Sequence, residues 1–149
     1  MTLHELSRRL DKFSITDEVI SVIEDTTGDI VKYNQDQLGL GLLSTGKEIK
    51  SFQTGSYFYS RGWEAYRKSL GLQTEYFDLK VTGAFWNSIG VDTVTKTTFD
   101  IDASDEKTPE LTRMFGDDIL GLSDDSKGRY VREVFRPELF NRIHLKLGL

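Results

Sequence analysis

The sequence predicts an α+β fold, in which N-terminal helices and C-terminal helices pack against a small antiparallel β-sheet that contains a β-hairpin. Apolar residues recur at helical spacing in residues 1–38 and again in residues 123–149. Between them, residues 78–104 are rich in β-branched residues and in part alternate between apolar and polar. No linker or low-complexity tract divides the 149 residues, so we expect one domain over residues 1–149.

The first part of the chain should form two helices. Thr2 and Glu5 have the spacing of a capping box, and leucines follow them at helical intervals. Ser14 or Thr16 then offers the N-cap of a second helix, which should run to about Leu38.

The second helix and the segment after it contain several residues that break regular structure. Thr26-Thr27-Gly28 lowers helix propensity, so we expect a kink or break there. Residues 39–46 contain the glycines that should end the helix, and residues 51–62 show no clear period. Residues 66–70 predict a turn or two of helix, which Gly71 should end.

Residues 51–62 are rich in aromatic side chains, and two interpretations are open. The rings pack within the protein, or, together with Arg61, Arg67 and Lys68, they stack on single-stranded bases. Because few basic residues accompany the rings in an acidic chain, we favour packing.

The hairpin should turn near Lys96. Phe99, Ile101 and Ala103 alternate with Asp100 and Asp102, which predicts a strand with one face toward the core and one toward solvent. The two aspartates then lie on the solvated face. No third ligand or partner base accompanies them, so we expect neither a metal site nor a catalytic pair there.

The C-terminal part should be helical. After a loop over residues 105–109, a short helix should end at Gly116. Ser123 is the expected N-cap of the last helical region, and Pro137 should kink or restart it.

Residues 41–48, GLLSTGKE, approach the pattern of a phosphate-binding loop. Gly41, Gly46 and Lys47 are in register, but Glu48 occupies the position of the hydroxyl that ligates Mg²⁺. The preceding segment looks helical, whereas a phosphate-binding loop follows a buried strand. We therefore predict a turn after a helix, and no nucleotide site.

Composition limits the classes of function. The net charge of −5 argues against general nucleic-acid binding. Residues 91–128 are locally acidic and residues 129–149 locally basic, so neighbouring copies could dock through opposite charges.

The chain has no cysteine, which excludes thiol catalysis and disulfides. No secretory signal or membrane-spanning run is apparent, so we expect a soluble protein made in the cytoplasm and no membrane partner.

The sequence contains no recognisable active site. His4 and His144 are the two histidines, and neither has neighbours at metal-ligand spacing. No nucleophile-elbow motif is present. We expect no catalytic residue, no cofactor and no metal.

Three stretches resemble a family of small phage and prophage structural proteins, the tail-completion or virion-morphogenesis proteins that join head and tail at the neck or act at the tail end. They are QLGLGLLSTGKEI (residues 37–49), DLKVTGAFWNSIGV (78–91) and MFGDDILGLS (114–123). The chain departs from the family where many relatives carry a proline after the Gly-Lys pair. Residues 1–36 lie outside the resemblance.

The resemblance implies a non-enzymatic virion component that forms a ring-like homo-oligomer and joins tail, neck or portal proteins. Its location would be the virion, after synthesis in the cytoplasm of a bacterial host. The alternative is a module of prophage origin that binds nucleic acid or a host factor. Direct contact with DNA is expected only if the module binds nucleic acid. The family-motif residues are Gln37, Leu38, Gly46, Lys47, Thr82, Gly83, Phe85, Ser88, Gly116, Gly121 and Leu122.

Within the second stretch, Thr82, Gly83, Phe85 and Ser88 should shape the entrance to the hairpin. The glycine permits a tight approach, the aromatic ring anchors the segment, and the hydroxyls satisfy local backbone groups. We expect Gly83→Val to prevent folding or assembly.

Overall fold

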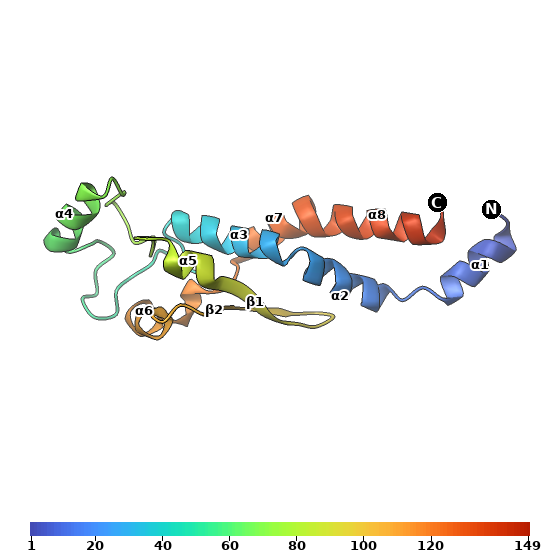
Figure 1. Ribbon diagram of the computed structural model, residues 1–149, viewed down its shortest axis with the longest axis horizontal. Helices are drawn as coiled ribbons and strands as arrows, with labels where there is room; N and C mark the ends of the chain where they lie inside the picture. The colour runs from blue at the N-terminus through green and yellow to red at the C-terminus, as the bar shows by residue number, and fades with distance from the viewer.

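A computed structural model describes residues 1–149 and confirms the α+β class: helices pack beside a two-stranded antiparallel hairpin. The molecule is elongated, with both termini at one end and α4 at the other (Figure 1). The elements are α1 (Leu3–Asp11), α2 (Ile15–Asp25), α3 (Thr27–Gly39), α4 (Arg61–Ser69), α5 (Ala84–Ser88), β1 (Ile89–Val94), β2 (Phe99–Ala103), α6 (Thr108–Phe115), α7 (Asp124–Tyr130) and α8 (Arg136–Leu147), with a 3-10 turn at Asp117–Ile119 and a π-helical turn at Val131–Phe135.

The N-terminal helices begin and end at the residues that the sequence indicates. Thr2 and Glu5 form the complete capping box of α1, and Ser14 caps α2. The expected break occurs at Thr26, which separates α2 from α3. The Thr26 hydroxyl accounts for the break, because it bonds to the Val22 carbonyl and lies 2.7 Å from the Tyr130 hydroxyl.

The hairpin turns near Lys96 as predicted, but it occupies less of residues 78–104 than expected. β1 pairs with β2 from Ile89 opposite Ala103 to Val94 opposite Phe99, with a bulge between Val91 and Thr93. Residues 84–88 are helical and form α5. This short helix lies in a stretch whose residue types favour neither helix nor strand, and Phe85 anchors it in the core.

The C-terminal helices form one continuous rod (Figure 1). Ser123 caps α7 as predicted. Pro137 cannot donate a backbone hydrogen bond, and the chain accommodates it with the π-helical turn just before α8, whose last bond runs from the Arg136 N–H to the Val131 carbonyl. The helix therefore changes type before Pro137 and starts again as α8, without a gap in the rod.

Two apolar clusters stabilise the fold. One joins the end of α3 to α5, the start of β1 and α6, and contains Leu38, Ile49, Phe77, Phe85, Ile89, Phe115 and Ile119. The other joins α2, α3 and α7, and contains Ile23, Ile30, Tyr33, Leu122 and Tyr130. α3 contributes to both, so it is the central element of the fold.

The packing predicted for the aromatic segment is wrong for most of its rings. Phe52 is 68% exposed and Phe58 is 66% exposed, whereas Tyr59 is half-buried. The backbone around them is irregular, as expected, and rings on a loop with so few apolar neighbours have no core to enter.

None of the helices is both long enough and apolar enough to span a bilayer.

Candidate functional site

The first and third motif stretches meet through a buried glutamine. Gln37 on α3 donates from Nε2 to the Gly121 carbonyl at 3.0 Å. Its Oε1 accepts from the Ser123 N–H at 2.8 Å and from the Ser126 hydroxyl at 3.0 Å. Gln37 is only 3% exposed, so these bonds replace water and fix the loop that starts α7.

Asn34, one turn earlier on α3, holds the same loop. Its Nδ2 donates to the Ile119 carbonyl at 3.2 Å, and its Oδ1 accepts from the Gly121 N–H at 2.8 Å. Gly121 has φ of +114°, a conformation that residues with a side chain rarely adopt. The glycine therefore allows the backbone conformation in which its N–H and its carbonyl both bond to side chains of α3.

The other residues of these two stretches are divided between core and surface. Leu38 and Leu122 belong to the two different apolar clusters. Gly116 ends α6, and Gly46 and Lys47 lie in an exposed turn. The sequence prediction of a connecting turn at residues 41–48 agrees with this placement.

The second stretch surrounds α5. Gly83, with φ of +88°, is the N-cap of α5, and Phe85 enters the core. The Thr82 hydroxyl accepts from the Ala84 N–H at 3.2 Å, and the Ser88 hydroxyl donates to the Phe85 carbonyl at 2.8 Å. These four residues lead into β1, with a helical turn between Gly83 and the hairpin. The tight approach expected at Gly83 is wrong, because a Cβ there would make only an ordinary contact with Asn87 Nδ2 at 3.6 Å; the positive φ is what requires glycine.

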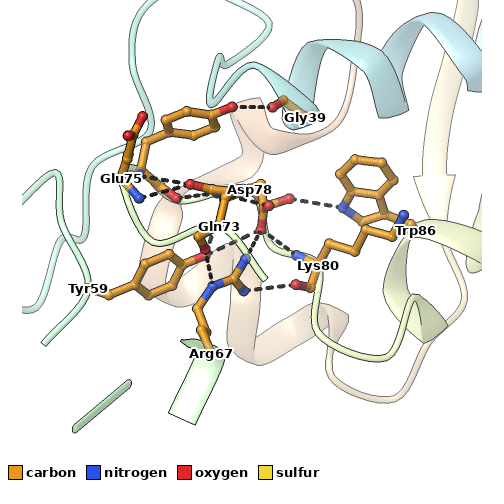
Figure 2. Close-up of polar contacts among 9 residues, drawn as sticks. Gly39, Tyr59, Arg67, Gln73, Glu75, Asp78, Lys80 and Trp86 are labelled. Carbon is orange, nitrogen blue, oxygen red and sulfur yellow. Dashed lines mark hydrogen bonds and ion pairs between the residues drawn. The ribbon is translucent and has the colours of Figure 1, made fainter. Parts of the chain in front are cut away.

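A buried arginine organises the end of the molecule that carries α4, a segment here called the α4 lobe (residues 50–81). Figure 2 shows Arg67 among the residues that it contacts. Its Nη2 lies 2.9 Å from Asp78 Oδ1, while Nε and Nη1 donate to the carbonyls of Gln73 and Lys80 at 2.9 and 2.8 Å. Arg67 is completely buried, and its bonds link three points of an otherwise irregular loop.

Tyr59 covers this arginine. The Arg67 Cζ lies 4.4 Å from the centre of the Tyr59 ring, and the Tyr59 hydroxyl donates to Asp78 Oδ1 at 3.3 Å (Figure 2). Burial is the main reason that the pKa of Tyr59 is raised to about 12, and the Asp78 charge adds to it. Arg67, Asp78 and Tyr59, with Gln73 bonded to the second carboxylate oxygen of Asp78, are here called the Arg67 cluster.

Trp86 connects the Arg67 cluster to the body of the protein. Its indole N–H donates to the Asp78 carbonyl at 2.9 Å, and its own carbonyl accepts from Gln35 Nε2 on α3 at 2.8 Å. The Lys80 ammonium lies 4.8 Å from the centre of the indole ring. The α4 lobe is therefore held in a defined orientation on α3 and α5.

The α4 lobe exposes several apolar side chains. Trp63 and Tyr66 on α4 pack against each other edge to face and are each about half exposed. We call the following set the aromatic surface: Phe52, Tyr57, Phe58, Trp63, Tyr66 and Leu70. Exposed aromatic residues gathered at one end of a protein are typical of surfaces that contact another molecule.

The ionisable residues do not converge on an obvious reaction centre. His4 and His144 are exposed, and no group of three or more His, Asp or Glu side chains is placed to hold a metal ion. Asp100 and Asp102 lie on the solvated side of β2, as predicted.

Sequence reasoning did not identify Asn34 or the pairing of Arg67 with Asp78. The sequence pattern indicates Arg67 only as part of a short helix and as a basic side chain beside aromatic rings. The sequence offers one signal. Arg67 and Asp78 flank a segment that contains Gly71 and shows neither helical nor strand periodicity, and a buried charged pair can hold such a segment together.

We compared the chain with protein-family models, with curated proteins and with solved structures, and none of them matches it.

Proposed function

We propose that this protein is a structural virion component of the tail-completion or neck type. It works by forming a ring-like oligomer that joins tail, neck or portal proteins, in a virion assembled after synthesis in the bacterial cytoplasm. The proposal rests on the exposed surface of the chain, and the three motif stretches give it the phage context.

The exposed area is large for the mass of the protein. The chain exposes 9449 Å² at 17.0 kDa, whereas a globular monomer of this mass exposes about 7,700 Å². The excess arises from the elongated shape. It is close to the roughly 1,600 Å² that one subunit buries against two neighbours in interfaces of standard size.

Exposed apolar side chains occur at both ends of the molecule. At the terminal end, α1 has no buried residue, and Leu3 is 86% exposed. An isolated helix of nine residues is unstable in water, so α1 needs a partner surface beyond its slight contact with α8. At the opposite end lies the aromatic surface of the α4 lobe.

The arrangement of the motif stretches also supports the proposal. Gln37 bonds directly to Gly121 and Ser123, and Leu38 and Phe85 share one apolar cluster. The three stretches that carry the resemblance therefore form one structural unit around the end of α3.

Binding of nucleic acid or a host factor is the second candidate, and the aromatic surface is the observation that favours it. Arg61 and Lys68 lie on α4 beside exposed rings, and the Lys50 ammonium lies 5.8 Å from the centre of the Tyr57 ring. Rings with neighbouring cations can stack on single-stranded bases.

The mass of the purified protein, alone and after mixing with phage tails, tests the leading proposal. Light scattering should show a concentration-dependent oligomer, and the protein should sediment with tails that lack it. A monomer that never enters particles contradicts the proposal. Retention on single-stranded DNA that falls steeply with added salt supports the second candidate instead.

A further inference from the structure

An acidic groove lies where β2 leads into α6. Its volume is about 700 Å³, and Ile101 and Leu120 give it an apolar part. Four carboxylates line it: Asp102, Asp105, Glu106 and Asp117. None of the four forms an ion pair within the chain, so their negative charge is uncompensated.

The groove also contains an unsatisfied hydroxyl. Thr108 lines it and is only 8% exposed, and its Oγ1 is the one buried side-chain polar atom in the chain without a hydrogen-bond partner. A buried hydroxyl without a partner is unfavourable by about 1–3 kcal/mol. This second feature indicates that the groove is complete only when another polar group occupies it.

A basic ridge lies on the C-terminal rod. Arg132 and Arg136 are four residues apart, so they share one face of the helix, and Phe140 follows one turn later. Both arginines are exposed, and neither forms an ion pair or a hydrogen bond within the chain. Phe140 is 54% exposed. We call these three residues the arginine ridge.

The groove and the ridge belong to different parts of the molecule. In Figure 1, α6 lies near α5, whereas α8 extends toward the two termini. Within the chain, no ion pair joins a ridge arginine to a groove carboxylate. Two different patches of the same chain that fit each other produce a head-to-tail interface, which closes into a ring or continues as a filament.

We infer that the acidic groove of one copy receives the arginine ridge of the next copy. This inference rests on the proposed function, and it identifies the interface through which the subunits of the proposed oligomer contact each other. Guanidinium groups bind carboxylates through paired, charge-assisted hydrogen bonds, and the buried Thr108 Oγ1 gains a partner when the groove wall shifts on docking. Phe140 then contacts the apolar part of the groove beside Leu120.

Charge reversal at exposed positions tests the interface without disturbing the core. The groove variant carries Glu106→Lys with Asp117→Lys, and the ridge variant carries Arg132→Glu with Arg136→Glu. The matched controls change the same charges elsewhere: Glu48→Lys with Glu75→Lys, and Lys47→Glu with Lys96→Glu, all exposed. Circular dichroism verifies that each variant is folded.

We expect the wild-type protein to self-associate, measured by analytical ultracentrifugation. Each interface variant should raise the dissociation constant about tenfold or more, because like charges then face each other, and each control should stay within about twofold. Mixing the groove variant with the ridge variant in equal amounts should restore association, since opposite charges then face each other at both the intact and the reversed contacts.

Three results would overturn this interface. If both interface variants associate like the wild type, the interface lies elsewhere while the proposed assembly role stands. If the controls weaken association as much as the interface variants do, net charge alone is responsible. A wild-type protein that is monomeric at every concentration removes the interface, and binding to tails then decides separately whether the proposed function holds.

Discussion

Arg67 Nη2 and Asp78 Oδ1 lie 2.9 Å apart in the interior of the α4 lobe, and the two residues come from the end of a helix and from an irregular loop. This pair adds a buried polar contact to the apolar packing that Phe77 and Tyr59 provide in the lobe. Arg67 also bonds to the backbone carbonyls of Gln73 and Lys80, so it ties the loop after α4 to the helix. The orientation of the aromatic surface therefore depends on this ion pair together with the contacts of Trp86.

Removing the arginine should loosen the lobe. Arg67→Met leaves the Asp78 charge buried and uncompensated, which costs about 3–5 kcal/mol when one partner of a buried pair is lost. Hydrogen exchange should show lost protection across residues 59–80, with α3 protected as before. Arg61→Met is the control, because Arg61 is exposed and its loss should change stability by less than about 0.5 kcal/mol. Unchanged exchange in Arg67→Met would show that the pair does not hold the lobe.

Tyr59 should make stability sensitive to high pH. The folded-state pKa of about 12 is above the unfolded value of about 10, so its contribution is complete below pH 10 and is lost as pH rises toward 12. In Tyr59→Phe, the free energy of unfolding, measured by urea denaturation, should fall less steeply between pH 10 and pH 12 than in the wild type. Tyr57→Phe, at an exposed ring, should leave the slope as in the wild type. Equal slopes in all three proteins would contradict the prediction.

Gln37 should be important for stability in spite of its polarity. Gln37→Met keeps the size of the side chain but leaves the Ser123 N–H and the Gly121 carbonyl without this partner. Each buried group left unpaired costs about 1–3 kcal/mol, so thermal unfolding should shift clearly downward. Gln53→Met at an exposed position is the control and should unfold like the wild type. A stable Gln37→Met would mean that water replaces the lost bonds.

Substitution of Gly83 should be limited by its backbone conformation and not by lack of space for a side chain. A Cβ there would lie 3.6 Å from Asn87 Nδ2, an ordinary contact, but φ is +88°. Gly83→Ala should therefore lower stability by about 1–2 kcal/mol, and valine by more. Gly62→Ala, within α4 at a position with open space, should raise stability by up to about 1 kcal/mol. Opposite shifts in melting temperature confirm the contrast, and similar shifts contradict it.

Local signals predicted the local structure of the chain. The capping box at Thr2, the caps at Ser14 and Ser123 and the turn near Lys96 each depend on residues within a few positions of one another. Helix α5 was not predicted, because its five residues are held by the burial of Phe85 and not by helix propensity.

The polar contacts that position the candidate site were largely unpredictable. Gln37 and Gly121 are 84 residues apart, and the sequence marks both only through a resemblance. The pairing of Arg67 with Asp78 depends on how an irregular loop folds, for which no periodic pattern exists. The sequence alone shows the charge difference between residues 91–128 and residues 129–149. Only the fold shows which of those charged side chains form no ion pair.

The first and last residues lie near each other at the end of the molecule opposite α4 (Figure 1). A gold particle or fluorescent dye attached at either extremity therefore marks the same pole of the subunit. Electron micrographs of labelled assemblies would then reveal which pole faces outward, while the aromatic pole stays free of any attachment.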